Sequence, residues 1–438
     1  MMKRIDVTLT LLIVAFLLLP FIARKSFANG FIIGEQDAEA MGAGGAFAAR
    51  ADNPSAIFYN PAGITQLDGI NVKLGTTLVT VQTTYDKPGG GDKSSNKDRV
   101  DTPLYFYLTG KINEKFSAGF GFYQPYGLAS DWQSNWPGRH IVTYALLRTY
   151  FFNPVFAWKP TEKLSVAFGV IGAYSDINLN SRLSYRKIAE ANGTTLPKGF
   201  LEGVEGHSRL RGDGGGAGVN AGFLYRINNK VKFGLSYRSP VRIRYFGRAE
   251  FRKADSSLSP LVAVVNALNY NSDVASKITM PPQLLAGISF APNEKLTLEF
   301  DIDWRGWSQF DTIRIRFKDK RVNRVDLNAN WKDTITYRVG MDYKLNDNVS
   351  LRAGYAYDPS CIKNNRLDPL VPDSDKHAIT VGFGYRWKKW TFDISNMALF
   401  FETASTHTAK AGFNNMFDFD AKYRTFANLT SISLSYKF

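Results

Sequence analysis

Short polar turns alternate with long irregular connections along most of this chain. From Gly69 onward the sequence repeats one unit, which is a run of about ten residues alternating in polarity, a tight turn, a second such run and a long connection. Asparagine and aspartate suit these turns because they tolerate the left-handed backbone that two-residue hairpins require. The six predicted turns are residues 112–115, 160–163, 227–230, 292–295, 345–348 and 387–389. The pattern predicts an all-β chain of consecutive hairpins.

The spacing of the turns predicts a membrane barrel. Roughly 40 to 70 residues separate successive turns, enough for two strands and one long loop. Short periplasmic turns and long extracellular loops are typical of outer-membrane barrels. Six turns join twelve strands, and a first strand near residues 69–85 and a last near 423–438 bring the total to about fourteen. We therefore expect a transmembrane antiparallel β-barrel over residues 69–438, with both termini on the periplasmic side.

Large apolar residues share one face of several predicted strands. A wide barrel interior holds polar groups and water, whereas hydrocarbon cannot, so we expect the apolar face to contact lipid. A large soluble sandwich would alternate too, but it would bury many Tyr and Trp rings whose polar tips need partners. The clearest alternation places Leu296, Leu298, Phe300, Ile302 and Trp304 opposite Thr297, Glu299, Asp301 and Asp303.

The N-terminus is predicted to be a secretory signal spanning residues 1–28. Lys3 and Arg4 precede an apolar run at residues 9–19, and Ser26 and Ala28 supply small residues before the cleavage site. A single membrane anchor is disfavoured because the run is shorter than the ~20 residues that a spanning helix needs. Cys361 is the only cysteine, so no internal disulfide forms. The sequence assigns Cys361 no role.

The chain is basic. Removing residues 1–28 deletes four basic side chains and one acidic one, which lowers the formal charge from +15 to +12. An exported protein rarely meets nucleic acid, so we expect no nucleic-acid partner. The excess charge instead favours anionic lipid, carboxylate ligands or a merely solvated surface.

The segment before the first strand, residues 29–68, is predicted to be a plug inside the barrel, and we call it the hatch. Two Asn-Pro steps and several glycines rule out a regular strand or a long helix. Ile57, Phe58, Tyr59 and Ile64 would be exposed outside a barrel. Inside a fourteen-stranded tube they would fill the lumen.

Several sequence blocks resemble the FadL-type outer-membrane long-chain fatty acid transporter family (OMPP1/FadL/TodX). They include "NGF" at 29–31, "NPAGI" at 60–64, "YGLASDW" at 126–132 and "LDPLVPDSDKHAITVGFGYRW" from Leu367. The resemblance implies a fourteen-stranded barrel with an N-terminal hatch, an apolar groove at the extracellular loops, an inner pocket and lateral exit beside a kinked third strand. It implies that Phe31 lines the inner pocket and that gating involves Asn60, Pro61, Ala62 and Gly63.

The predicted third strand, 115–127, is interrupted at Gln124 and Pro125. Proline removes a ladder donor, which is compatible with a kink. A strand that simply ends there fits equally well.

Two predicted loops are apolar and supply candidate ligand contacts. Residues 258–269 show helical spacing of apolar side chains, as expected for an amphipathic turn. Exposed apolar patches usually mark an interaction site, although two such loops could also pack on each other. The candidates are Leu196, Phe200, Leu261, Val265 and Leu268.

Inward-facing arginines are candidates for binding a ligand carboxylate by charge-assisted hydrogen bonds. Strand parity places Arg238, Arg242, Arg338, Arg352 and Arg386 on the inner face, and Arg238, Arg338 and Arg352 are the candidates we retain. The alternative is that they pair with Glu299, Asp301, Asp303 or hatch carboxylates.

We expect passive transport of long-chain fatty acids or other hydrophobic compounds, with capture at the loops and hatch-gated lateral exit. An aromatic hydrocarbon channel and a general porin for polar solutes are the alternatives. The histidines lie scattered with no motif for a nucleophile and base and no metal-ligand spacing, so we expect no enzyme, cofactor or metal. We also expect a monomer in the outer membrane of a Gram-negative bacterium, in contact with lipid. The chain ends on the aromatic residue Phe438, which resembles the signal read by the barrel assembly machinery, so we expect this machinery to be a partner.

Overall fold

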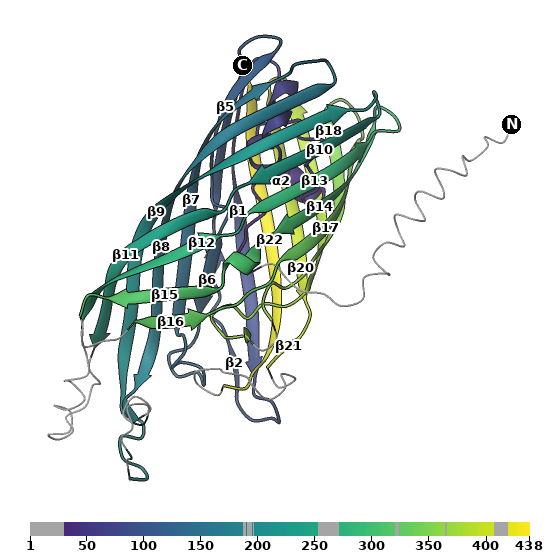
Figure 1. Cartoon of the computed structure of the whole chain (residues 1–438). Coiled ribbons are helices and arrows are strands. Elements are labelled where there is room, and N and C mark those ends of the chain that lie inside the picture. The colour runs from purple at the N-terminus through teal and green to yellow at the C-terminus, as the bar shows by residue number, and fades with distance from the viewer. Residues whose placement is uncertain are drawn as a thin grey trace.

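The computed structural model describes residues 30–186, 190, 195, 197–252, 271–319, 324–363, 366–406 and 419–438. The predicted signal, residues 1–28, lies outside this part of the chain. Within it, fourteen antiparallel wall segments form a tilted barrel (Figure 1), which confirms the predicted fold class. None of the described helices is both long and apolar enough to cross a membrane.

Several of the wall segments are broken into two shorter strands. In chain order the wall comprises β1 (Ile70–Asp86), β3 (Val100–Asp101) with β4 (Leu104–Lys111), β5 (Phe116–Tyr123) with β6 (Gly127–Asp131), β7 (Tyr144–Trp158), β8 (Leu164–Ser184), β9 (Glu205–Arg226), β10 (Val231–Arg238) with β11 (Val241–Arg252), β12 (Ser272–Met280) with β13 (Gln283–Phe290), β14 (Leu296–Arg305) with β15 (Thr312–Phe317), β16 (Val325–Asn328) with β17 (Thr334–Lys344), β18 (Val349–Asp358), β19 (Lys376–Trp387), β20 (Trp390–Phe401) and β22 (Lys422–Lys437). The short strands β2 (Lys93–Ser95) and β21 (Ala404–Ser405) extend β1 and β22 at the long-loop end, and η3 (Trp307–Gln309) follows β14.

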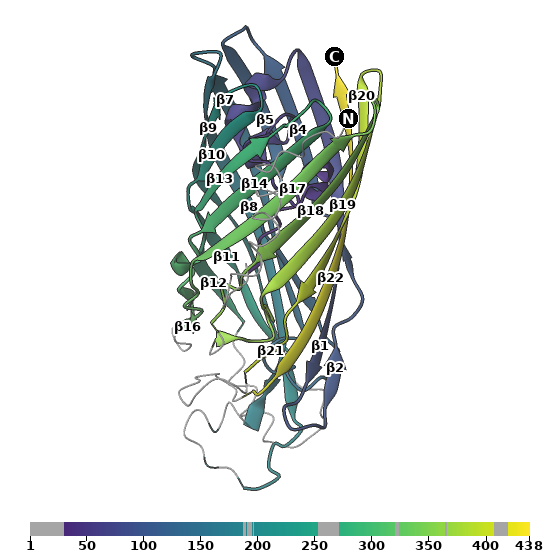
Figure 2. The ribbon, with the colours of Figure 1, turned by 90° about the vertical axis from the view of Figure 1, so that its right-hand side faces the viewer.

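The wall closes where the first strand meets the last. β1 and β22 pair along their length, with Asn71 opposite Lys437 and Asp86 opposite Lys422 (Figure 2). This pairing removes the free edges of the first and last strands, which a barrel in lipid requires because hydrocarbon offers no hydrogen-bond partners.

The six predicted short turns all connect neighbouring wall strands, but the asparagines act differently from the prediction. Asn113, Asn228, Asn293 and Asn346 each accept hydrogen bonds through Oδ1 from backbone nitrogens two and three residues later. Among these turns, a left-handed residue other than glycine occurs only at Lys388, with φ 55°. Side-chain acceptance, rather than left-handed backbone, therefore explains the asparagines.

The predicted faces of the strands are confirmed for most of the barrel. Ile302, Val381 and Trp387 are exposed on the outer surface, while Asp301 and Thr380 are buried inside. Arg242 is an exception, because it faces outward and not inward. Residues 239–240 lie between β10 and β11, and the break shifts the parity so that Arg238 points in and Arg242 points out.

The N-terminal segment lies inside the barrel, as expected for a plug (Figure 1). It contains α2 (Ala38–Gly42), α3 (Ala56–Tyr59) and the 3₁₀ helix η2 (Pro61–Gln66), followed by β1. The largest buried apolar cluster joins this segment, through Phe47 and Ile57, to inward-facing rings such as Tyr107. The core of the molecule is thus the seam between hatch and wall.

Candidate ligand-binding site

An apolar cavity of about 500 Å³ lies between the hatch N-terminus and the extracellular loops. This volume falls in the range of about 300–1,000 Å³ that is common for small-molecule sites. Its sides are inward-facing residues of the wall strands, since alternate strand residues point into the lumen. They include Leu147, Ile177, Tyr245, Ile278 and Ile313.

Aromatic rings surround Phe31 at one side of the cavity. The Phe31 ring centroid lies 5.0 Å from that of Trp307, 5.5 Å from Phe310 and 5.6 Å from Trp331. Gly30 precedes it with φ +64°, and a Cβ there would lie 2.6 Å from the Trp331 ring. Only glycine therefore lets the chain enter this aromatic cluster without displacing it.

Two charged side chains from the connection between β18 and β19 line the same cavity. Arg366 has a buried Nε without a hydrogen-bond partner among the described residues. Asp368 accepts backbone hydrogen bonds from Leu370 at 2.7 Å and Val371 at 3.4 Å. Burial raises the pKa of Asp368 to about 6, against the opposing effect of these two bonds. The cavity is thus mainly apolar, and the charged residues in its lining are Arg211, Asp326, Arg366 and Asp368.

The hatch N-terminus also fills a break in the wall. β5 ends at Tyr123 and β6 begins at Gly127, and both pair with β7. Across the break at Gln124 and Pro125, Ile33 N donates to Pro125 O at 2.9 Å and Gly127 N donates to Phe31 O at 3.0 Å. The Gln36 side chain adds a hydrogen bond of 2.8 Å to Gln124 O. The backbone of Phe31 therefore seals the broken strand while its ring lines the cavity.

A buried ion cluster holds the hatch to β1, β18 and β20 of the wall. Lys73 Nζ on β1 lies 2.5 Å from Asp37 Oδ1 and 3.7 Å from Asp393 Oδ2, with the lysine side chain fully buried. Arg352 contacts Asp393 at 2.8 Å and hatch residue Glu39 at 3.5 Å. Charges buried in this way are stable only while each keeps its partners.

Two wall carboxylates expected to pair with arginines instead bind hatch backbone. Asp301 Oδ2 accepts hydrogen bonds from Phe47 N at 2.8 Å and Ala48 N at 3.0 Å. Glu299 Oε1 accepts one from Ala49 N at 2.6 Å. Because the hatch here is irregular, its amide groups need such acceptors.

Asn60 and its neighbours anchor the hatch to the wall. The Asn60 side chain donates to Ala48 O at 2.7 Å and Phe223 O at 3.0 Å, and its oxygen caps Ala62 N, after Pro61, at 3.2 Å. A Cβ on Gly63 would lie 2.2 Å from Ala51 O. This geometry explains the Asn-Pro-Ala-Gly sequence as an anchor, whatever its part in gating.

The three candidate arginines lie apart from the cavity. Arg238 donates to Phe58 O at 2.8 Å and Gln283 Oε1 at 2.9 Å, Arg338 lies 3.4 Å from Asp303, and Arg352 belongs to the ion cluster. None of them lines the cavity. All three arginine side chains bind groups of the hatch or the wall, which is the arrangement that the alternative of internal pairing describes.

The apolar candidates have different outcomes. Phe31 lines the cavity, whereas Phe200 lies in the turn beyond β8, away from it, and its carbonyl accepts from Arg186. Leu196, Leu261, Val265 and Leu268 lie outside the described residues. Sequence reasoning missed the cavity residues Phe310, Trp331, Arg366 and Asp368, and it missed Trp307, which packs against Phe31. The rings of Trp304, Trp307 and Phe310 follow one another closely in the sequence and were a signal for part of this set, whereas Arg366 and Asp368 had none.

Comparison with known proteins identifies the family. The model of the outer membrane protein transport family (OMPP1/FadL/TodX) matches residues 19–438. Protein NMB0088 of Neisseria meningitidis serogroup B is 27% identical, covering 95% of this chain and 96% of that protein. The long-chain fatty acid transport protein of Escherichia coli O6:H1 is 24% identical, covering 84% and 86%.

Solved structures share the fold. A Pseudomonas aeruginosa FadL homologue superposes with a TM-score of 0.82 at 21% identity, covering 94% of this chain and all of that one. The Pseudomonas putida toluene transporter TodX gives 0.70 at 18% identity, covering 94% and 99%. With the family model matching nearly the whole chain, the protein belongs to the OMPP1/FadL/TodX family of outer-membrane transport proteins.

Proposed function

We propose that this transporter carries long-chain fatty acids into the cell passively, with the cavity beside Phe31 as the binding site. Its family transports hydrophobic compounds across the outer membrane of Gram-negative bacteria and is not enzymatic. The apolar lining supports an apolar substrate because its transfer from water is favourable at about 25 cal/mol per Å². The single observation that carries the proposal is this apolar cavity, which the hatch residue Phe31 helps to line.

A carboxylate at one end of the ligand would account for Arg366. Its buried Nε lacks a partner among the described residues, and a buried donor left unpaired costs about 1–3 kcal/mol. A fatty-acid carboxylate would accept from it in a charge-assisted hydrogen bond. Asp368, which lines the cavity together with the charged residues Arg211 and Asp326, would accommodate an anion best when protonated.

The connection between Phe31 and the broken strand supports lateral exit at Gln124 and Pro125. A ligand that displaced the Phe31 ring would pull on the same residue whose carbonyl oxygen binds Gly127 N. Loss of that bond and of the Ile33 bond would uncover the break between β5 and β6. The ion cluster and Asn60 would keep the rest of the hatch in place.

Uptake of monoaromatic hydrocarbons is the second candidate, favoured by the rings of Trp307, Phe310 and Trp331 around Phe31. The Escherichia coli relative is named for long-chain fatty acids and the Pseudomonas putida structure for toluene, so the comparisons leave both open. A general porin is disfavoured because the hatch packs against the wall inside the lumen.

Uptake of labelled oleate and labelled toluene by cells with and without the protein tests the proposal. We expect oleate uptake to depend on the protein. Toluene uptake alone would establish the second candidate. Uptake of neither, with rapid passage of small sugars, would overturn hydrophobic transport and favour the porin.

A further inference from the structure

A groove on the outer face of the barrel lies across the wall from the ligand cavity, and Ile177, Arg211, Gly212 and Gly247 contribute to the lining of both. It has a volume of about 820 Å³ and lies across β5, β7, β8, β9 and β11, toward the long-loop end of these strands. Most of its lining side chains occupy outward-facing strand positions, so they point toward the membrane and not into the lumen. Transport through the lumen does not explain this groove.

One half of the groove is aromatic. Phe122 lies 5.3 Å from Phe152 and 6.2 Å from Tyr150, measured between ring centroids, and Tyr150 lies 6.1 Å from Tyr174. These rings come from three adjacent strands and form a continuous apolar strip on the lipid-facing surface. Such a strip suits acyl chains, and aromatic rings gather at the boundary between hydrocarbon and headgroups.

The other half of the groove is basic. Arg148, Arg209, Arg211 and Arg248 line it together with Asp176 and Asp213. Arg148 pairs with Asp176 at 2.8 Å, and Arg211 pairs with Glu250 at 3.0 Å. Within the described ranges, Arg209 and Arg248 form no ion pair, and Arg209 has only a hydrogen bond of 3.4 Å to Asn178.

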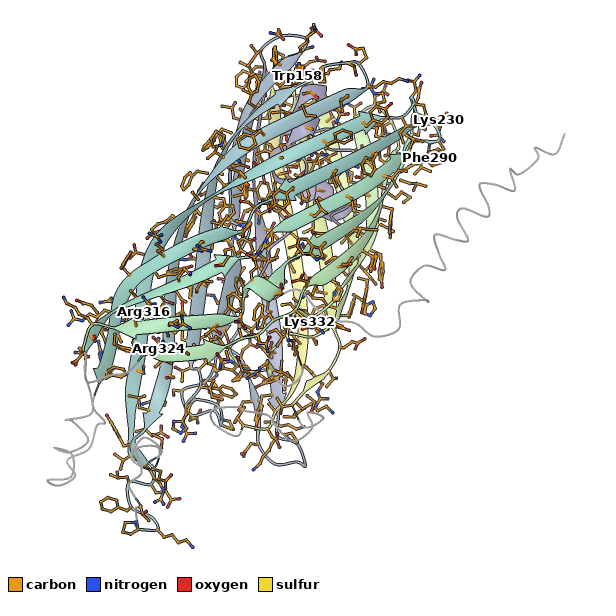
Figure 3. All side chains as sticks on the ribbon, in the orientation of Figure 1. Trp158, Lys230, Phe290, Arg316, Arg324 and Lys332 are labelled. Atoms are coloured by element: carbon orange, nitrogen blue, oxygen red, sulfur yellow. The ribbon has the colours of Figure 1, made fainter. Side chains whose placement is uncertain are left out.

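The basic charge continues along β11 beyond the groove. Its outward positions hold Arg242, Arg244, Arg248 and Arg252 against one acid, Glu250. Arg316 on β15 extends the same half of the wall (Figure 3). Arginines in such excess repel one another unless anions from outside the protein lie between them.

The change from apolar to charged residues marks the membrane boundary. Along β9 the outward residues are Val219, Ala217 and Gly215, and then Asp213 and Arg211 toward the loops. Along β8, the outward ring of Tyr174 is followed by Asp176. The groove arginines Arg209, Arg211 and Arg248 therefore lie just beyond the apolar band toward the long loops, at the height of the outer-leaflet headgroups, because the long loops of such barrels are extracellular.

We propose that this groove binds an outer-leaflet lipid through the phosphate of its headgroup. Arg209 and Arg248 donate charge-assisted hydrogen bonds to the phosphate oxygens, since guanidinium groups match phosphate with paired donors. The acyl chains lie along Phe122, Phe152 and Tyr174. The site fixes a lipid on the outside of the wall, beside the strand that breaks at Pro125, and it is independent of which compound is transported.

The test uses the full-length mature protein, delipidated in detergent. It is titrated either with a phosphorylated glycolipid or with the dephosphorylated form of the same glycolipid. Native mass spectrometry counts the lipid molecules bound. We expect the phosphorylated form to bind about tenfold or more tightly, since one charge-assisted bond is worth about 1.5–3 kcal/mol and tenfold is 1.4 kcal/mol. The double substitution R209Q/R248Q should abolish this preference. Both substituted side chains face outward, so the double substitution should leave the core intact. Unchanged circular dichroism and unchanged toluene binding would verify this.

A matched control removes the same charge at the other end of the barrel. R226Q/R386Q changes two exposed arginines beside short turns and should keep the preference. Equal binding of the two glycolipids, equal loss in both double variants, or displacement of the glycolipid by oleate would each overturn the proposal. The last result would make the groove part of the transport route.

Discussion

The backbone nitrogen of Ile33 lies 2.9 Å from the carbonyl oxygen of Pro125, so the start of the hatch completes the wall strand where proline interrupts it. Gly127 N returns a bond of 3.0 Å to Phe31 O. Such a pair of bonds across a break contributes little free energy, because each is worth about 0.5–1.5 kcal/mol net. Together the two bonds hold the seal by roughly 1–3 kcal/mol.

Replacing Ile33 by proline should loosen this seal. I33P removes the N–H that donates to Pro125 O, and a loss of about 0.5–1.5 kcal/mol raises the open population roughly two- to tenfold. Amide hydrogen exchange at Gly127 measures that population, and toluene efflux from proteoliposomes should rise with it. The matched control is I32P, because no hydrogen bond is recorded for the neighbouring amide. Equal exchange in both variants would show that the bond does not hold the seal.

Replacing Lys73 by methionine should release the hatch from the wall without unfolding the barrel. The ammonium group is fully buried beside Asp37 and Asp393, and removing one partner of a buried ion pair costs about 3–5 kcal/mol. Faster hydrogen exchange in residues 37–60 and a higher single-channel conductance would report the release. K115M changes an exposed turn lysine and should alter neither. Unchanged exchange in K73M would show that Asn60 and the wall carboxylates suffice.

The barrel could be predicted from the sequence because its determinants are local. A two-residue period fixes which face meets lipid, as at Ile302 and Asp301, and short turns fix which strands are neighbours. Parity failed at Arg242 because a break between two strands resets it, and no pattern marks the break except Pro240.

The site could be predicted only in part because its determinants are distant in sequence. Phe31 followed from the family resemblance, but the rings around it come from two connections, Trp307 and Phe310 after β14 and Trp331 before β17, where no period applies. Lys73 alternates inward between Val72 and Leu74, yet its partners come from the hatch and from β20. Parity predicts that an arginine points inward, but it gives a direction and not a depth, so it does not separate ligand contacts from internal ion pairs.

Affinity for an uncharged ligand should rise as the pH falls through 6. Burial raises the pKa of Asp368 from 3.8 to about 6. Between these two pH values the folded protein holds a proton that the unfolded chain releases. The contribution of Asp368 to the free energy of unfolding therefore falls as the pH rises. Toluene in the cavity would remove more water from Asp368 and raise its pKa further. A further rise of half a unit corresponds to about threefold tighter binding at pH 5 than at pH 7.5. D368N should bind equally at both values, and a persistent pH dependence in D368N would assign it to another group.

Arg366 should separate the two candidate substrates. R366Q removes the charged donor of a hydrogen bond to a ligand carboxylate, but it keeps a polar side chain of similar length. Oleate affinity should therefore fall about tenfold, whereas toluene affinity should stay within about twofold. Tryptophan fluorescence can follow both ligands, since Trp307 and Trp331 pack against Phe31. The control R338Q removes an inward arginine paired with Asp303 away from the cavity, and it should leave the affinity ratio unchanged. Equal loss for oleate and toluene in R366Q would mean that Arg366 shapes the cavity instead of binding a carboxylate, and it would leave the aromatic cluster around Phe31 as the better guide to the substrate.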